Sequence, residues 1–107
     1  MQVDERASGS SVDLGVGQTL EVRLAENPTT GFRWQIEADG RPACTLTSDL
    51  YEAAGGPPGS GGTRVLAYRG TSPGECTIAL AYRRSWEAAA SAAQTFMLRV
   101  RVVADRP

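Results

Sequence analysis

The chain has 107 residues, with 11 basic and 12 acidic side chains, a formal net charge of −1 and no histidine. This length suits one domain, the balanced charge provides no strong field for nucleic acid or an anionic membrane, and no apolar run approaches the ~20 residues that cross a bilayer. Because histidine and the zinc, EF-hand and phosphate-loop motifs are absent from the sequence, we expect no metal site and no cofactor.

Residues 1–9 are polar and contain no hydrophobic run. We interpret them as a flexible N-terminal segment that precedes a single domain over residues 10–107. The segment lacks the hydrophobic region of a secretory signal. The chain is accordingly expected to be either cytoplasmic or a secreted or periplasmic mature form whose signal has been removed.

Alternating apolar and polar residues predict strands along the rest of the chain. In residues 19–24, for example, Leu20, Val22 and Leu24 share one face while charged residues share the other. Strands are predicted over residues 10–13, 19–24, 32–38, 44–47, 64–68, 76–82 and 96–102. Short strands at this spacing, with no long helix, are typical of an immunoglobulin-like antiparallel β-sandwich, and we predict this all-β fold with about seven strands.

The segment 27–32, with the sequence NPTTGF, connects the second and third predicted strands. Asn27-Pro28 opens a turn, because proline fixes its own φ and pushes the preceding residue out of the helical region. Gly31 can adopt a φ that a side chain would forbid. A strand follows at once, so we expect a restricted turn on a rigid base. A plain hairpin turn is the alternative.

Two further segments interrupt the strand pattern. Gly59 to Gly62, with the sequence GSGG, ends a glycine- and proline-rich loop over residues 51–62, and Arg84-Ser85-Trp86 begins a loop that continues to Ala93. The alanine-rich part of this last loop is too short for an independent helix. In an immunoglobulin-like sandwich, the loops after the second, fourth and sixth strands lie at one end. The strand order therefore predicts that all three segments share one pole.

In this order and spacing, the three segments resemble the chagasin-type inhibitors of papain-like cysteine peptidases, which carry an NPTTG turn, a GxGG loop and an RPW loop on an immunoglobulin-like sandwich. The resemblance extends from about Val12 to Val103, and it departs from the family at Ser85, where proline is usual. It implies a monomeric, reversible, competitive and tight-binding inhibitor that plugs the active-site cleft with three loops. The peptidase-binding residues that it implies are Asn27, Pro28, Thr29, Thr30, Gly31, Phe32, Gly59, Ser60, Gly61, Gly62, Arg84, Ser85 and Trp86.

The residue types in these loops suit a wedge that enters a groove. A proline and a strand-anchored glycine reduce the entropy lost on binding. Thr29 and Thr30 offer hydroxyls near the thiolate–imidazolium pair of the peptidase, and Trp86 is expected to be the aromatic anchor. Arg84 is expected to pair with an acidic rim or to stack on an aromatic ring. With serine at position 85 the loop backbone keeps conformational freedom that proline would remove, so we expect Ser85 to make inhibition weaker than in relatives with proline.

Other interpretations remain open for single residues and for the whole chain. Trp86 packed back into the core is the alternative to an exposed anchor, and Trp34 and Tyr82 are expected in the core. Arg83, Arg99 and Arg101 are expected to form a solvated strand face. A non-inhibitory immunoglobulin-like module that binds another ligand through the same loops is the alternative function. An enzyme is the least favoured class, because neither histidine nor lysine is present.

The two cysteines, Cys44 and Cys76, are too far apart in the sequence for a CxxC motif. The strand order brings both to the end of the sandwich opposite the three segments. Two alternatives follow: a disulfide between them, or two separate buried thiols.

Overall fold

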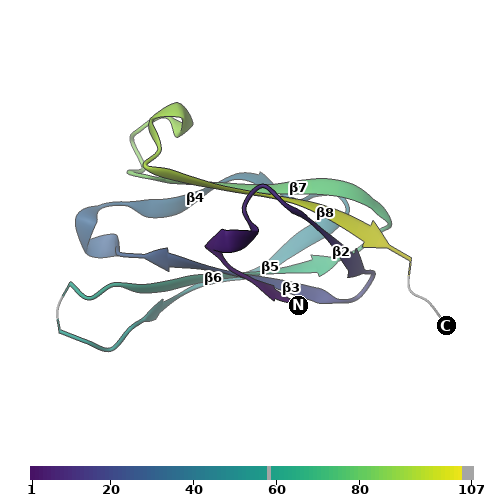
Figure 1. The fold of residues 1–107 in the computed structure, drawn as a ribbon, viewed down its shortest axis with the longest axis horizontal. Helices are drawn as coiled ribbons and strands as arrows, with labels where there is room; N and C mark the ends of the chain where they lie inside the picture. The colour runs from purple at the N-terminus through teal and green to yellow at the C-terminus, as the bar shows by residue number, and fades with distance from the viewer. Residues whose placement is uncertain (58, 105–107) are drawn as a thin grey trace.

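The computed structural model describes residues 1–57 and 59–104, which form two β-sheets that pack face to face (Figure 1). The strands are β1 (Gln2–Val3), β2 (Ser11–Gly15), β3 (Thr19–Glu26), β4 (Arg33–Asp39), β5 (Cys44–Ala53), β6 (Gly62–Gly70), β7 (Gly74–Arg83) and β8 (Gln94–Val103). Short 3₁₀ turns also occur, namely η1 (Glu5–Ala7), η2 (Pro28–Thr30) and η3 (Ala89–Ser91). The predicted all-β sandwich is confirmed.

One sheet has the strand order β1-β3-β6-β5, and the other has the order β2-β8-β7-β4. The pairs inside each sheet, β3–β6, β5–β6, β4–β7 and β7–β8, are antiparallel. The structure adds two parallel pairs at the edges, β1 with β3 and β2 with β8. Alternation does not reveal the direction in which strands pair, so only the structure identifies these edges.

The core lies between the two sheets and contains the side chains that the alternation assigns to it. Leu20, Val22 and Leu24 of β3 are fully buried, and Ile78 and Leu80 of β7 oppose them from the other sheet. Burying a side chain of this size contributes about 1.5–3 kcal/mol to folding. This core gives the loops at the ends of the strands a rigid support.

The first nine residues begin on the sheet that contains β3 and end against β8 of the other sheet, where the Gly9 N–H donates to the Met97 carbonyl oxygen. β1 pairs Gln2 with Glu21 and Val3 with Val22, and both Val3 and Ala7 pack against the core. The flexibility expected of this segment, and the domain boundary at residue 10, stay predictions. Residues 105–107 of the predicted domain lie outside the described residues.

β5 and β6 are both longer than predicted. β5 continues to Ala53 and β6 begins at Gly62, so the connection between them shortens from residues 51–62 to residues 54–61. Most side chains in the second half of β5 are exposed, and apolar alternation therefore does not mark this part of the strand. The extended ladder, with Ala53 opposite Gly62, carries the connection away from the core.

The two ends of the sandwich differ. The β3–β4, β5–β6 and β7–β8 connections lie together at one end, and β8 finishes at the other (Figure 1). Cys44 of β5 and Cys76 of β7 come from different sheets, and the Cys76 thiol donates to the Cys44 sulfur over 3.5 Å. Both are free, buried thiols in this structure, so the disulfide stays a prediction. Among the described residues, no helix has the length and apolar character needed to cross a membrane.

Candidate functional site

The first turn, residues 27–31, is a capped 3₁₀ turn. Asn27 is extended and its side-chain oxygen accepts a hydrogen bond from the Thr29 backbone N–H at 3.2 Å, while Pro28 occupies the first position of the turn. Gly31 closes the turn at φ +83°, a conformation that side chains rarely adopt, and its N–H donates to the Pro28 carbonyl oxygen. The turn is therefore ordered by its own sequence.

The two threonine hydroxyls lock this turn. Thr29 Oγ1 donates to the Asn27 side-chain oxygen at 2.6 Å, and Thr30 Oγ1 donates to the Asn27 carbonyl oxygen at 2.7 Å. The Phe32 N–H in turn donates to Thr30 Oγ1. Both hydroxyl protons are used inside the turn, and these bonds fix the rotamers of the two threonines. Because both threonines are exposed, their hydroxyl oxygens can still accept hydrogen bonds from a bound partner.

The second loop, residues 54–61, is tied to the first turn. Asn27 Nδ2 donates to the Gly59 carbonyl oxygen at 2.9 Å. Gly61 has φ +76°, and a Cβ there would lie 3.2 Å from both Asn27 Cβ and the Glu26 carbonyl oxygen. Gly59 and Ser60 are exposed. Only glycine therefore allows this loop to pass so close to the first turn.

Gly62, predicted to bind the peptidase, belongs to the sheet. It pairs with Glu26 on one side and with Ala53 on the other. A Cβ at this position would overlap the carbonyl oxygen of Glu52 and lie 2.8 Å from the Tyr51 hydroxyl. Close packing of the ladder thus explains this glycine without any partner.

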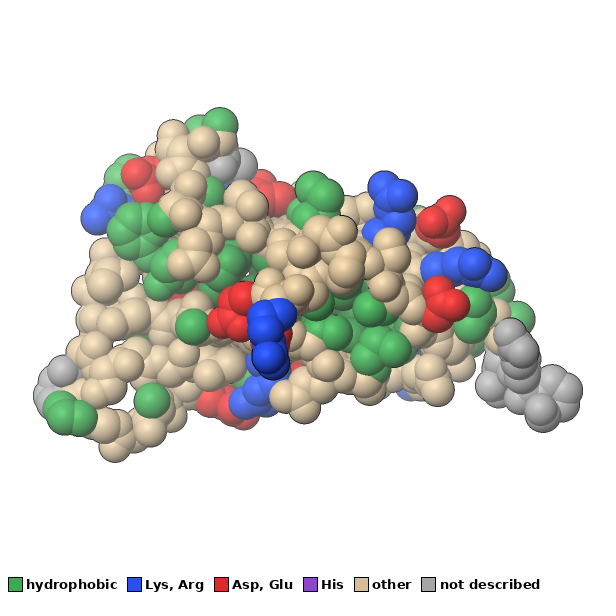
Figure 2. Space-filling view, viewed as in Figure 1, with side chains coloured by type: hydrophobic (Ala, Val, Ile, Leu, Met, Phe, Trp, Pro, Cys, Tyr) green, Lys and Arg blue, Asp and Glu red, His purple; other side chains and the backbone are tan. Residues whose placement is uncertain are grey.

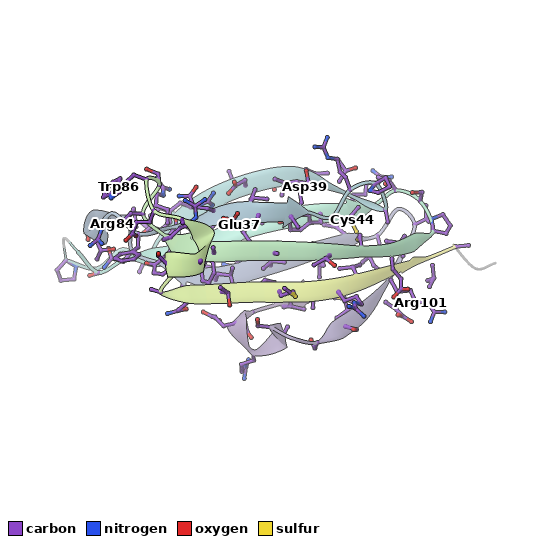
Figure 3. All side chains as sticks on the ribbon, turned by 90° about the horizontal axis from the view of Figure 1, so that it is seen from above. Glu37, Asp39, Cys44, Arg84, Trp86 and Arg101 are labelled. Carbon is purple, nitrogen blue, oxygen red and sulfur yellow. The ribbon has the colours of Figure 1, made fainter. Side chains whose placement is uncertain are left out.

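The third loop, residues 84–93, presents an exposed tryptophan. Trp86 is 77% exposed, so its side chain does not return to the core. The Arg84 guanidinium carbon lies 4.3 Å from the centroid of the Phe32 ring, at the base of the first turn. Figure 3 shows Arg84 and Trp86 side by side at the end that carries the loops, with Cys44 and Arg101 toward the other end.

A row of aromatic rings lies beneath the loops. The Phe32 and Tyr82 rings stack with their centroids 5.6 Å apart, and the Tyr82 and Trp34 centroids are 5.0 Å apart. Trp34 is buried, as predicted, and its indole N–H donates to the Ala25 carbonyl oxygen. The Tyr82 hydroxyl accepts a hydrogen bond from the Asn27 N–H at 3.1 Å. Asn27 therefore contacts all three segments or the residues that support them.

A buried carboxylate anchors the first turn and β6 from below. The Glu26 side chain has no exposed surface, and its Oε2 accepts hydrogen bonds from the Trp34 N–H at 2.7 Å and from Arg64 Nη1 at 2.9 Å. Arg33 Nη2 lies 3.5 Å from the other oxygen. Arg64 also pairs with Asp49 on β5. This arrangement satisfies a charge that would otherwise be costly to bury.

The expectation that Arg83 belongs to a solvated strand face is wrong. Its side chain is only 17% exposed and pairs with Glu37, and its Nη1 donates to the Glu87 carbonyl oxygen at 2.7 Å. Arg99 and Arg101 are exposed, as expected. The carbonyl oxygens that surround Arg83 become neighbours only when the third loop folds back, so strand alternation does not reveal them.

Four supporting residues were missed from the sequence: Glu26, Tyr82, Arg83 and Glu87. A signal was available for Glu26, because it continues the inward-facing series of Leu20, Val22 and Leu24 with a charged residue. Tyr82 likewise continues the buried series of β7, and it was expected in the core without a link to the first turn. Glu87, whose carboxylate accepts the Arg84 N–H, lies in a segment without strand or helix periodicity.

The site offers a polar and aromatic surface from which Trp86 projects. Hydrophobic side chains gather at the base of the third loop, which is the upper loop at the left end of the view (Figure 2). Within the described residues, no cluster of histidine, cysteine or acidic side chains could hold a metal ion. Ordered turns, exposed threonines and a projecting tryptophan are suited to contact with another protein.

Comparisons with known proteins agree on one family. The family model "Chagasin family peptidase inhibitor I42" matches residues 13–100. Amoebiasin-1 of Entamoeba histolytica is 32% identical over 102 residues, which cover 95% of this chain and 99% of the relative. Chagasin of Trypanosoma cruzi is 29% identical over 90 residues, or 79% of this chain and 82% of the relative. The solution structure of amebosin superposes with a TM-score of 0.77 at 33% identity, covering 95% of this chain and 96% of that one.

Proposed function

The chain belongs to the chagasin family of peptidase inhibitors, and we propose that its three loops fill the active-site cleft of papain-like cysteine peptidases in a reversible, competitive and tight complex. The family is one of inhibitors, not of enzymes. The observation that carries the proposal is the convergence of the first turn, the second loop and the third loop at one end of the sandwich. Asn27 links them through Gly59 and Tyr82.

The first turn is suited to occupy a cleft without being cut. The carbonyl oxygen of Asn27 accepts the Thr30 N–H, and that of Pro28 accepts the Gly31 N–H. A peptide held in this 3₁₀ turn does not present an extended backbone to a nucleophile in attack geometry. The turn therefore blocks the catalytic thiolate while it resists acylation.

The other loops supply area and anchoring on either side of the turn. Ser60 is exposed and Gly61 is half-buried, and neither has a bulky side chain, so the backbone of this loop can approach the main chain along a cleft wall. Trp86 projects its indole into solvent and is available for burial in a partner. Arg84, held over Phe32, places a cation between the turn and the tryptophan.

A papain inhibition assay tests this proposal. Purified protein is titrated against papain and cathepsin-type peptidases with a fluorogenic peptide substrate, and the inhibition constant is determined at several substrate concentrations. We expect full inhibition whose apparent constant rises linearly with substrate concentration, as competition requires. Peptidases that keep full activity at micromolar protein would refute the proposal and favour a binding module with another ligand.

A further inference from the structure

The third loop lacks the proline that is usual in the family, yet its backbone is held at several points. The Glu87 N–H donates to the Arg84 carbonyl oxygen at 3.0 Å, and the Arg84 N–H donates to the Glu87 carboxylate at 3.0 Å. At the far end, the Ala93 N–H donates to the Tyr82 carbonyl oxygen. These bonds close the loop, but none of them reaches Ser85.

The Arg83 guanidinium supplies the missing contact. Its Nη1 lies within hydrogen-bond distance of three carbonyl oxygens of the loop, those of Glu87 at 2.7 Å, Ser85 at 3.3 Å and Arg84 at 3.4 Å. The Glu87 bond is the shortest of the three and the strongest. The Arg83 guanidinium therefore contacts the backbone on both sides of Trp86.

Arg83 is itself fixed from β4. Its Nε and Nη2 donate to a single oxygen of Glu37 at 3.1 and 3.0 Å. Glu37 lies where the β4–β7 register shifts between Ile36 and Ala38. With one edge of the guanidinium held by the carboxylate and Nη1 directed at the loop, the planar group can serve both partners at once.

We propose that Arg83 is a positioning residue, which holds the third loop in its binding conformation and replaces the order that a proline at position 85 would supply; the inference rests on the proposed function. Arg83 has no need to touch the peptidase for this role. It raises the fraction of free inhibitor whose third loop is ready to bind, and apparent affinity is proportional to that fraction. Ser85 therefore costs this chain little affinity as long as Arg83 is present.

The first test compares Arg83→Met with a matched control, Arg101→Met, which removes an exposed arginine near the opposite end. We expect the inhibition constant of Arg83→Met for papain to rise about tenfold, while that of Arg101→Met stays within twofold of wild type. Glu37→Gln, which keeps Arg83 but weakens its support, should give a smaller rise in the same direction. An Arg83→Met variant that inhibits as well as Arg101→Met would overturn the proposal.

The second test is rescue by proline. The Ser85 backbone N–H donates no hydrogen bond within the described residues, so Ser85→Pro removes none. We expect Ser85→Pro to restore most of the affinity lost in Arg83→Met and to improve inhibition by a smaller factor in the wild-type background, where Arg83 already orders the loop. A gain from Ser85→Pro that is no larger in the Arg83→Met background than in wild type would count against the proposal.

A third measurement needs no peptidase. Hydrogen–deuterium exchange of the free domain should show faster exchange of the Glu87 and Ala93 amides in Arg83→Met, with the amides of β7 and β8 unchanged. Unchanged exchange in residues 84–93 would refute the positioning role. If wild-type protein failed to inhibit papain, the proposed function would fall, and this measurement would still decide whether Arg83 orders the loop.

Discussion

Among single residues of the described chain, Trp86 is the large hydrophobic side chain that packs least against the rest of the protein. It is 77% exposed, whereas the other exposed large hydrophobic residues of the described chain reach at most 57%. Exposing this much apolar surface to water is unfavourable in free energy, and burying the indole in a partner would remove that unfavourable term. We therefore expect Trp86 to contribute to binding and not to stability.

The Trp86→Ala variant tests this division. We expect the inhibition constant for papain to rise about thirtyfold or more, equivalent to about 2 kcal/mol, while the free energy of unfolding in urea changes by less than about 0.5 kcal/mol. Met97→Ala, which removes another exposed apolar side chain from β8, serves as the control and should leave inhibition unchanged. A Trp86→Ala protein within threefold of wild type would exclude the tryptophan as an anchor.

Thr29 and Thr30 act through the shape of the first turn. Replacing both by alanine removes the two hydroxyl bonds to Asn27, each contributing about 1 kcal/mol to the order of the turn. We expect inhibition about tenfold weaker, with the thermal midpoint of the domain unchanged because both residues are exposed. Thr45→Ala on the exposed side of β5 is the matched control. Unfolding of the double variant at a lower temperature would show that the turn supports the core instead.

At the scale of elements, the loops depend on the ends of β3, β4 and β6, and Glu26 joins all three. Glu26→Gln keeps the size of the side chain but removes the charge that Arg64 and Arg33 neutralise. We expect a loss of about 2 kcal/mol or more in urea unfolding, together with weaker inhibition, because the supports of the first turn shift. Glu21→Gln, which breaks a partly exposed pair with Arg23, should cost less than about 1 kcal/mol. Equal losses in the two variants would contradict the anchoring role of Glu26.

The elements that the sequence predicts well are those with one buried face. β3 and β7 alternate between the core and solvent, so their residues identify both the strand and its inward face. The second half of β5 is exposed on both faces, and β1 pairs over only two residues, so neither leaves an apolar pattern. The sequence pattern places Gly62 in a loop for the same reason, since a glycine required by a tight ladder looks like a glycine required by a turn.

The common end of the three segments was predictable because it follows from strand order in a sandwich. The contacts that order them were not. Asn27 bonds to Gly59, 32 positions away in the chain, and to Tyr82, 55 positions away. Arg83 lies on the outward side of its strand, where alternation predicts solvent, and only the return of the third loop covers it. Long-range polar contacts of this kind depend on loop conformation, which residue patterns leave undetermined.

For the domain as a whole, the raised pKa values of two buried groups, Cys44 and Tyr68, connect stability to pH. Burial raises the pKa of the Cys44 thiol and of the Tyr68 phenol above their ordinary values of 9.0 and 10.0. The Tyr68 hydroxyl has no hydrogen-bond partner in the described residues. Both groups are therefore protonated in the folded state at a pH where the unfolded chain has begun to lose its protons.

Stability should accordingly fall in alkali. The contribution of each group is fully present below its ordinary pKa and is lost as the pH rises toward the raised pKa of the folded state, by at most about 1.4 kcal/mol per pH unit and group. Urea unfolding under reducing conditions should show a plateau up to about pH 9 and a decline above it. Tyr68→Phe removes one group and an unpaired hydroxyl, so it should be at least as stable as wild type at pH 7 and decline less steeply. A wild-type profile that is flat to pH 11 would refute this account.

Cys44 and Cys76 give the sandwich a means of cross-linking its two sheets, away from the three loops. Their sulfurs are 3.5 Å apart and the residues are 32 positions apart in the chain. During refolding with glutathione disulfide, one cysteine thiolate displaces a glutathione thiolate and forms a mixed disulfide. The second cysteine thiolate attacks this mixed disulfide and releases the other glutathione thiolate. The two cysteines thereby lose two electrons, which reduce one glutathione disulfide to two thiols. Closing this loop should stabilise the fold by about 3–4 kcal/mol and raise the thermal midpoint by about 15 °C. Thiol titration and thermal unfolding measure both effects, and Cys76→Ser should show neither. Oxidised protein that has lost both thiols but melts like the reduced form would show that the two sheets do not gain stability from the bond.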